Sequence, residues 1–267
     1  MISTFKKNIT LAIGSFVSVL VIYLFVSDDG PIPLISVAKA KSYDKLNKLP
    51  DFSKIKDVKE KKELFFNTLY PIIKQENEHV LKLRKIVILF QDVPAEELSH
   101  KQKVWLNKVA THYKVDGENV DKHFFTNLLE RVDVIPPSLA LTQAAIESGW
   151  GSSRFSKQGN NIFGQWCFSK GCGMVPSSRD LQKSHEVAKF SSINESVRSY
   201  IRNLNTNASY KALRKKRGQL RQKEEAVTGL LLAQTLDKYS EEGHFYVAKI
   251  SQFINQNKLQ RFTAQFN

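Results

Sequence analysis

The chain has 267 residues, 42% of them hydrophobic and 10% aromatic, which excludes an intrinsically disordered protein and leaves room for one catalytic-sized domain with extensions. Lysine and arginine total 40 against 26 aspartate and glutamate residues, giving a formal net charge of +14 and a sequence pI of about 9.6. This charge favours an anionic partner: nucleic acid, lipid headgroups or an acidic polymer such as a cell wall.

An uncharged apolar run near the N-terminus predicts that the rest of the chain is exported. The run covers 18 residues, from Ile9 to Val26, which is at the short end of what crosses a bilayer. Two lysines precede the run and two aspartates follow it, so the positive-inside rule places the N-terminus in the cytoplasm. We expect residues 1–30 to be a membrane anchor, with residues 9–26 as its transmembrane helix.

The alternative for this segment is a signal peptide that is cleaved after export. Small residues suited to cleavage, Ala38 and Ala40, lie some way beyond the apolar run. Both the anchor and the cleaved signal export the remaining chain, so both argue against binding to nucleic acid.

Residues 31–56 contain three prolines and little periodicity, which is typical of a linker. Apolar residues three and four positions apart then predict helices over residues 57–90 and 94–115. Pro71 is expected to kink or divide the first helix, and Pro94 with two early acids should open the second. These helices form a helical extension, residues 57–118, which we expect to pack against the domain that follows.

Residues 119–267 predict a mainly α-helical domain with a small β lobe. Helical periodicity marks residues 124–135, 138–148, 194–205, 209–217, 222–236 and 241–257. Between Gly159 and Phe190, glycines and serines interrupt the helices, and the stretch "SHEVAKF" alternates like a strand. The basic run over residues 213–223 predicts a solvated helical face that could also touch an anionic substrate.

The two cysteines, Cys167 and Cys172, lie in "WCFSKGC". In an exported protein, this spacing favours a disulfide that closes a small loop. A metal site is the alternative, but it needs more ligands than two thiols, and the nearest histidine, His185, stands alone. The six histidines are scattered without ligand spacing, so we expect neither a metal nor another cofactor.

Glu147 is the residue whose position most invites a chemical interpretation. It comes at the end of a predicted apolar helix that Gly149 stops, and an aromatic loop follows. Burial and the negative end of the helix dipole should both raise the pKa of this carboxyl. A glutamate with a raised pKa beside an aromatic cleft is what a general acid for breaking a glycosidic bond requires. The alternative is a structural role, in which Glu147 caps the helix or pairs with Arg154.

The surrounding sequence resembles a known family. The stretches "ALTQAAIESGWGSSRF" and "NNIFGQW" are similar to the catalytic segment of the bacterial N-acetylglucosaminidases of glycoside hydrolase family 73. The similarity continues through "FSSINESVRSYIRNLNTNASYKALR" and "LDKYSEEGHFYVAKISQFI", and so covers about residues 124–254, roughly half the chain. The order of segments is most like that of the Bax-type envelope proteins of Gram-negative bacteria.

This resemblance implies a lysozyme-like fold for residues 119–267 and cleavage of β-1,4 bonds after N-acetylglucosamine in peptidoglycan. It implies a periplasmic protein, either held at the inner membrane by residues 9–26 or soluble after signal cleavage. Glu147 matches the general acid, and Tyr239 and Tyr246 match two late tyrosines of the family, the first of which faces the cleft. The loop that shapes the cleft is matched by Trp150, Asn161, Phe163 and Gly164.

Three further aromatic residues have weaker assignments. Trp166 is a candidate for stacking on a sugar ring, with a role in the core as the alternative. Tyr200 and Tyr210 match recurrent aromatics of the family, and we expect both to serve packing rather than binding.

The sequence departs from the family in its second carboxylate. Many members carry an acid in the β lobe within a Thr-Glu-Tyr-like context, which is missing here. Glu186 is the better candidate for that role and Asp180 the weaker, whereas Glu195 should cap a helix. A lobe carboxylate could activate water as an inverting base. Without one, the substrate's own 2-acetamido group could act as the nucleophile, with Glu147 serving first as acid and then as base.

Two other functions fit the same residues. A lytic transglycosylase also uses a single glutamate but forms a 1,6-anhydro sugar instead of adding water. A membrane-tethered protein that binds the wall without cleaving it would also keep much of this pattern. In all three cases, the positive charge would favour the acidic peptide stems of the wall.

Overall fold

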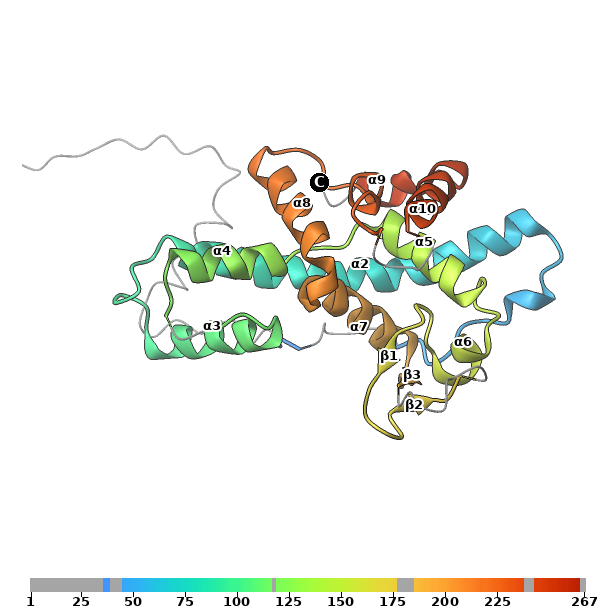
Figure 1. Cartoon of the computed structure of the whole chain (residues 1–267), viewed down its shortest axis with the longest axis horizontal. Coiled ribbons are helices and arrows are strands. Elements are labelled where there is room, and N and C mark those ends of the chain that lie inside the picture. Colours follow the sequence, from blue (N-terminus) through green and yellow to red (C-terminus); the bar gives the residue numbers. More distant parts are fainter. Residues whose placement is uncertain (1–35, 39–44, 117–118, 177–184, 238–242, 265–267) are drawn as a thin grey trace, which may run out of the picture.

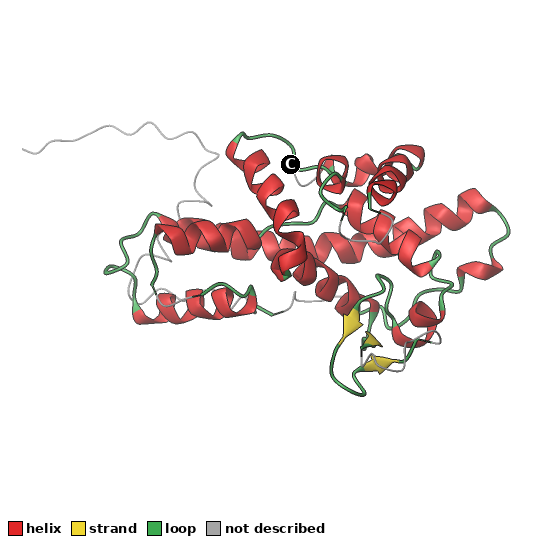
Figure 2. Ribbon diagram, viewed as in Figure 1, coloured by secondary structure: helices red, strands yellow, loops and turns green. Residues whose placement is uncertain are grey.

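A long helix, α2 (Val58–Gln91), runs along the molecule, and most other elements are arranged around it (Figure 1). Three later helices pack directly on α2, namely α4 (Lys122–Arg131), α5 (Pro137–Ser148) and α7 (Ile193–Thr206). A small β lobe projects from one side, and helices make up most of the remainder (Figure 2). The mainly α-helical fold with a small β lobe that the sequence predicts is therefore confirmed.

The computed structural model describes residues 36–38, 45–116, 119–176, 185–237 and 243–264. The predicted transmembrane segment, residues 9–26, and the candidates Asp180 and Tyr239 lie outside these residues. Among the helices within the described ranges, none is both long enough and apolar enough to cross a membrane.

Helix α2 is one continuous helix, so Pro71 does not divide it, and a kink at Pro71 stays a prediction. Asp57 caps its N-terminus by accepting a hydrogen bond from the amide of Glu60 at 2.7 Å. Pro71 cannot donate to the carbonyl of Asn67 four residues earlier. Because both residues are exposed, water can satisfy that carbonyl, and the helix continues through Ile72 on its buried side.

Helix α3 (His100–His112) begins later than the predicted start at Pro94. The physical reason is a capping box, in which Ser99 accepts from the amide of Gln102 and Gln102 accepts from the amide of Ser99. One hydrophobic cluster contains buried side chains from many elements, the first in the sequence being Phe52 and the last Leu259. The helical extension therefore packs into the same core as the residues that follow it.

Helix α5 is almost entirely buried, and its ends match the sequence signals for it. Pro137 occupies the first turn, and Gly149 ends the helix in the left-handed conformation, with φ of 55°. Helix α9 (Gly229–Ala233) packs closely on α5: a β-carbon on Gly229 would lie 2.3 Å from Oγ of Ser138. A side chain at this position would push the two helices apart.

In the described part of the β lobe, three short antiparallel strands follow the order β1-β3-β2. They are β1 (Trp166–Cys167), β2 (Gly173–Met174) and β3 (Glu186–Ala188). In the central strand, Glu186 pairs with Cys167, and Val187 lies opposite both Trp166 and Met174. A short helix that was not predicted, α6 (Arg154–Gly159), precedes the lobe.

Helix α8 (Lys211–Gln222) corrects the interpretation of the basic run as a solvated face. Arg214 and Arg217 are buried, at 4% and 0% exposed. Arg217 approaches the carboxylate of Asp133 at 3.8 Å, and Arg221 binds the same carboxylate at 3.1 Å. Part of the positive charge of this run therefore holds the core together.

The last helices are shorter than predicted. The prediction of a helix over residues 222–236 is wrong for its first half. Glu224 takes a left-handed conformation, with φ of 56°, and α9 begins only after its N-cap, Thr228. Helix α10 (His244–Gln256) falls within the predicted residues 241–257. A final 3-10 turn, η3 (Leu259–Phe262), packs against α5.

Candidate active site

Glu147 lies half-buried on the last turn of α5, where three parts of the chain meet. From α10, the Tyr246 hydroxyl donates a hydrogen bond of 2.9 Å to its Oε1. From the loop after α6, Gly164 faces the other oxygen: a β-carbon there would lie 3.9 Å from Oε2. The structure thus brings Glu147, Tyr246 and Gly164 together, as a shared site requires.

Two buried residues extend the contact between Tyr246 and Glu147 into a chain of hydrogen bonds. Nε2 of Gln143 donates to the Tyr246 hydroxyl at 3.0 Å, and the Tyr200 hydroxyl donates to Oε1 of Gln143 at 2.5 Å. We call Tyr200, Gln143, Tyr246 and Glu147 the hydroxyl–amide relay. Gln143 was not singled out from the sequence, and Tyr200 was assigned to packing. The one local signal was the spacing of four residues between Gln143 and Glu147, which puts both on one face of α5.

Burial and neighbouring groups raise the pKa values of the tyrosines near Glu147. Burial, and then the charge of Glu147, raise the pKa of Tyr246 above its ordinary value of 10.0. The same two causes raise the pKa of Tyr210. Burial also raises the pKa of Tyr200, with smaller contributions from Tyr246 and Tyr210. All three hydroxyls therefore keep their protons at neutral pH and are able to donate.

Side chains of the Asn-x-Phe-Gly loop fix its position through hydrogen bonds and ring stacking. The Asn161 amide group donates to the carbonyls of Gln165 and Ala188 and accepts from the amide of Gln165. The Phe163 ring stacks on Tyr200 with centroids 3.9 Å apart and planes 8° apart. Asn161 and Phe163 are buried, and the third predicted residue of this motif, Gly164, with φ of 64°, adjoins Glu147.

Trp150 lies in an aromatic cluster. Its ring lies 5.4 Å from Phe65 and 5.5 Å from Phe253, measured between centroids. Its backbone is left-handed, with φ of 59°, which turns the chain sharply after Gly149. These contacts tie the segment after Glu147 to α2 and α10.

Trp166 is exposed on β1, which excludes the alternative of a role in the core. Its side chain is 50% exposed, and the edge of its ring meets His185 at 4.4 Å between centroids. Phe168, two residues later, is 79% exposed. The β lobe therefore presents aromatic rings to solvent close in sequence to Gly164.

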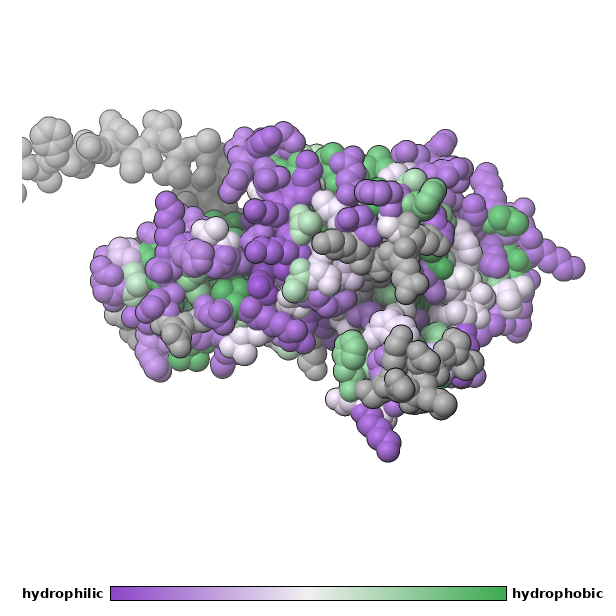
Figure 3. Space-filling model, in the orientation of Figure 1, coloured by the Kyte–Doolittle hydropathy of each residue, from purple (hydrophilic) through white to green (hydrophobic). Residues whose placement is uncertain are grey.

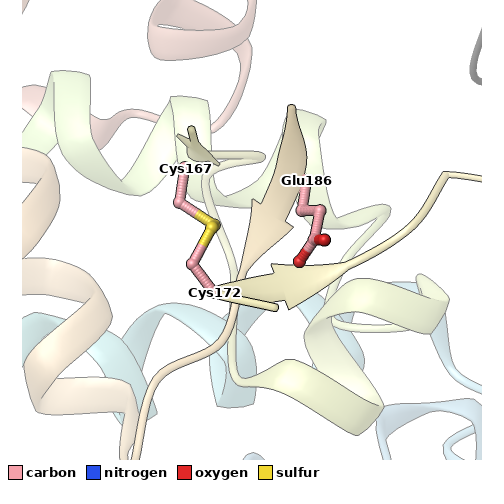
Figure 4. Close-up of side chains that lie close together, drawn as sticks. All are labelled: Cys167, Cys172 and Glu186. Carbon is pink, nitrogen blue, oxygen red and sulfur yellow. A yellow bond between two sulfur atoms is a disulfide. The ribbon is translucent and has the colours of Figure 1, made fainter. Parts of the chain in front are cut away.

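Glu186 holds the loop that the two cysteines close (Figure 4). Its carboxylate accepts from the amides of Gly171 at 3.0 Å and Gly173 at 2.8 Å, and the residue is 6% exposed. Cys167 and Cys172 are joined in a disulfide. The two sulfurs and a Glu186 oxygen lie within 4.8 Å of one another, but sulfurs bonded to each other are not thiolate ligands for a metal.

Two other charged residues considered from the sequence, Glu195 and Arg154, have structural partners. Glu195 accepts from the amide of Ser191 at 2.7 Å at the start of α7, so its expected capping role is confirmed. Arg154, the alternative partner for Glu147, donates instead to the carbonyl of Val175 at 2.8 Å.

The described site is thus a helix-end carboxylate held by a tyrosine, and sequence comparison identifies the family. Residues 122–259 match the Glucosaminidase family, described as mannosyl-glycoprotein endo-β-N-acetylglucosaminidase. The chain belongs to this family and is a glycoside hydrolase, which confirms the resemblance found in its motifs.

Two individual proteins are similar to this chain. Protein bax from Escherichia coli (strain K12) is 36% identical over 203 residues, which is 76% of this chain and 72% of that protein. The catalytic domain of the autolysin Auto from Listeria monocytogenes is 22% identical, covering 62% of this chain and 89% of that domain. Its TM-score is 0.38, too low for the structural likeness to carry any argument.

Proposed function

We propose that the protein is a peptidoglycan hydrolase that cleaves the β-1,4 bond after N-acetylglucosamine, with Glu147 as the general acid. The observation that carries the proposal is the setting of Glu147, with Tyr246 donating to Oε1 and Gly164 facing Oε2. One oxygen is fixed by a hydrogen bond, and the other faces Gly164, a residue that has no side chain. Membership of the Glucosaminidase family supports the choice of sugar.

In the proposed mechanism, Glu147 protonates the oxygen that leaves, and the substrate's own 2-acetamido group attacks the anomeric carbon. This gives a cyclic intermediate, and Glu147, now ionised, removes a proton from the water that opens it. A second protein carboxylate, acting as nucleophile or base, is not needed. The engagement of Glu186 by two backbone amides supports this route over one in which Glu186 activates water.

Exposed aromatic rings of the β lobe are proposed to bind the glycan. Trp166 is half exposed, and an exposed indole can stack on the apolar face of a sugar ring. We also propose that Tyr239, outside the described residues, faces the cleft as its match to the family's late tyrosine implies. Trp150, Asn161 and Phe163 are proposed to support the site through packing and hydrogen bonds.

We propose that the enzyme works in the periplasm, held at the inner membrane by residues 9–26. The disulfide between Cys167 and Cys172 supports an oxidising compartment, because cytosolic thiols are kept reduced. Fractionation of cells that express the full chain tests this location: recovery with the inner membrane is expected. Recovery in the soluble periplasmic fraction would favour the cleaved signal instead.

The bond that is cleaved is tested by mass spectrometry of the fragments that the full chain releases from purified sacculi. Fragments with reducing N-acetylglucosamine ends are expected. Fragments ending in 1,6-anhydromuramic acid would make the protein a lytic transglycosylase. Retained binding to sacculi without any release would leave a wall-binding protein.

The route through the 2-acetamido group makes a separate prediction about stereochemistry. Two displacements at the same carbon retain its configuration, so the first product observed by NMR should be the β-anomer. An α-anomer would contradict this route and would require a base that activates water directly.

A further inference from the structure

Gln143 is a buried amide whose hydrogen bonds end on the proposed catalytic acid. Gln143, Tyr200 and Tyr246 are each no more than 2% exposed. The three hydrogen bonds of the relay are 2.5 Å from Tyr200 to Gln143, 3.0 Å from Gln143 to Tyr246 and 2.9 Å from Tyr246 to Glu147. The relay connects α7, α5 and α10, so its geometry depends on the packing of all three helices.

Tyr200 determines which groups of the relay donate and which accept. A tyrosine hydroxyl has one hydrogen, and a glutamine side chain has one acceptor oxygen. If the Gln143 amide were turned over, Tyr200 would accept from its nitrogen, and the Tyr200 hydrogen would be buried without the Gln143 oxygen to receive it. An unsatisfied buried donor is costly, so the observed orientation is favoured.

The orientation of Gln143 in turn directs Tyr246. Because Nε2 of Gln143 donates to the Tyr246 oxygen, the single hydrogen of Tyr246 points away from Gln143 and towards Oε1 of Glu147. An oxygen that accepts this hydrogen is disfavoured as the site of the carboxyl proton. The proton then belongs on Oε2, the oxygen that faces Gly164.

We propose that Gln143 is a positioning residue, which, with Tyr200, aims the Tyr246 hydroxyl at Oε1 so that Glu147 carries its reactive proton on Oε2. This inference rests on the proposed function of Glu147 as the acid. The raised pKa values of Tyr200 and Tyr246, caused first by burial, are consistent with it because both hydroxyls remain donors. Gln143 does not touch substrate in this role; it acts through Tyr246.

The test follows the protonation of Glu147 directly. The full chain is labelled with ¹³C at its glutamate carboxyls, and the Glu147 signal is assigned by its loss in Glu147→Gln and followed by NMR as pH is varied. Tyr246→Phe removes the hydrogen bond to Oε1, so Glu147 should keep its proton to a pH about one unit higher. Gln143→Met and Tyr200→Phe should move the titration in the same direction by about half as much.

Thr142→Val is the matched control, because Thr142 is a buried polar residue of α5 that donates to Ser138 and lies outside the relay. It should leave the titration of Glu147 unchanged. Gln143→Met and Tyr200→Phe titrations that match this control would overturn the inference. If Gln143→Met fails to fold, Tyr200→Phe, which lacks a single oxygen, decides alone.

Release of fragments from sacculi, measured across pH with the same variants, separates this inference from the proposed function. If the wild type is active, its rate of fragment release should decline above a certain pH. In the relay variants, this decline should occur at a higher pH than in the wild type. A rate that falls without any shift of this decline would mark Gln143 as merely structural. A wild type that titrates as described but releases nothing would overturn the proposed function and leave the hydrogen-bond assignment standing.

Discussion

At the scale of single residues, Glu147 is half-buried and has one oxygen fixed by a hydrogen bond. Tyr246 donates to Oε1 of Glu147, and Gln143, which lies on the same helix as Glu147, donates to Tyr246. The other members of the relay are therefore uncharged groups. Phe163 stacks on Tyr200, the member of the relay that is furthest from Glu147 along the chain of hydrogen bonds. A carboxyl held in this way needs little reorganisation when it transfers its proton, and such preorganisation is a large part of enzymatic rate enhancement.

Trp166→Ala tests the proposed sugar contact at this scale. Loss of a stacking ring should raise KM for soluble glycan fragments roughly five- to tenfold, with kcat little changed, because the contact forms equally in ground and transition states. The melting temperature should stay within about one degree, since the ring is half exposed. Val175→Ala, also exposed in this region, is the matched control. An unchanged KM would exclude Trp166 from binding.

At the scale of elements, the β lobe depends on covalent and charge-assisted links more than on its short strands. The disulfide closes the loop between β1 and β2, and Glu186 on β3 binds the amides of Gly171 and Gly173. Hydrogen bonds to an ionised carboxylate are stronger than those between neutral groups. Glu186 therefore gives the loop a defined shape from the neighbouring strand.

Glu186→Gln separates this structural role from catalysis. The amide keeps one acceptor oxygen, so fragment release should stay within about threefold of wild type, while the amide of Gly171 or Gly173 should exchange its hydrogen faster. Rates of release and hydrogen exchange measured on the same preparation provide the two results. A loss of about a thousandfold in kcat would instead identify Glu186 as a catalytic base.

A buried ion cluster links the helical extension to α8. Asp133 is 1% exposed and lies 3.6 Å from Arg84 of α2, 3.1 Å from Arg221 and 3.8 Å from Arg217. Burial alone would raise the pKa of Asp133, but the charges of Arg217, Arg84 and Arg221 together lower it below 3.8. The cluster therefore stabilises the fold whenever Asp133 is ionised.

Asp133→Asn should cost about 3–5 kcal/mol of unfolding free energy, because it leaves the buried Arg217 and the half-buried Arg84 and Arg221 without their counter-charge. The pH dependence follows from the sign of the shift. A carboxyl whose folded pKa is depressed contributes stability above its unfolded pKa, and this is lost as pH falls through the folded value. Urea unfolding at pH 7 and at about pH 3 should show that the difference between wild type and variant shrinks in acid. An equal difference at both pH values would contradict the assignment.

At the scale of the whole molecule, the helical extension and the residues after it form one packed body. Helix α2 contacts α4, α5 and α7, and its aromatic residues surround Trp150, which directly follows the turn after Glu147. On the face shown in Figure 3, hydrophilic side chains predominate, in keeping with a core that is shared within the molecule. We infer that residues 57–118 support the site structurally.

Removal of residues 1–91 tests this inference. A chain without α2 should not fold cooperatively, because Phe65, Leu69 and Ile73 of the shared core would be missing. Circular dichroism on heating should show no sharp transition for this chain. Removal of residues 1–35 alone is the control and should leave the transition intact. A cooperative transition without α2 would show that residues 92–267 fold independently of α2.

Local signals in the sequence were sufficient for some features. Proline at the start of α5 and Gly149 at its end mark its boundaries, and the family motif points to Glu147. The capping box at Ser99 was also readable, but Pro94 was a competing start signal. Each of these signals lies within a few residues of the feature that it specifies.

Features that depend on distant partners could not be predicted in this way. Gln143 meets Tyr200 and Tyr246 across 57 and 103 residues of sequence, so its role appears only when the helices are packed. Arg217 lies in a run that reads as a solvated face, and its burial depends on Asp133 and on carbonyls more than 80 residues away. Periodicity and composition carry no information about such pairings.

The most direct test of the proposed function compares sacculi digested by wild type and by Glu147→Gln, with fragment ends identified by mass spectrometry. The amide keeps the size of the side chain and an acceptor for Tyr246 but cannot donate an acidic proton. Wild type should release fragments with reducing N-acetylglucosamine ends, and Glu147→Gln should release at least a thousandfold less while still binding sacculi. Release by Glu147→Gln at a rate near that of wild type would contradict the assignment of Glu147 as the acid.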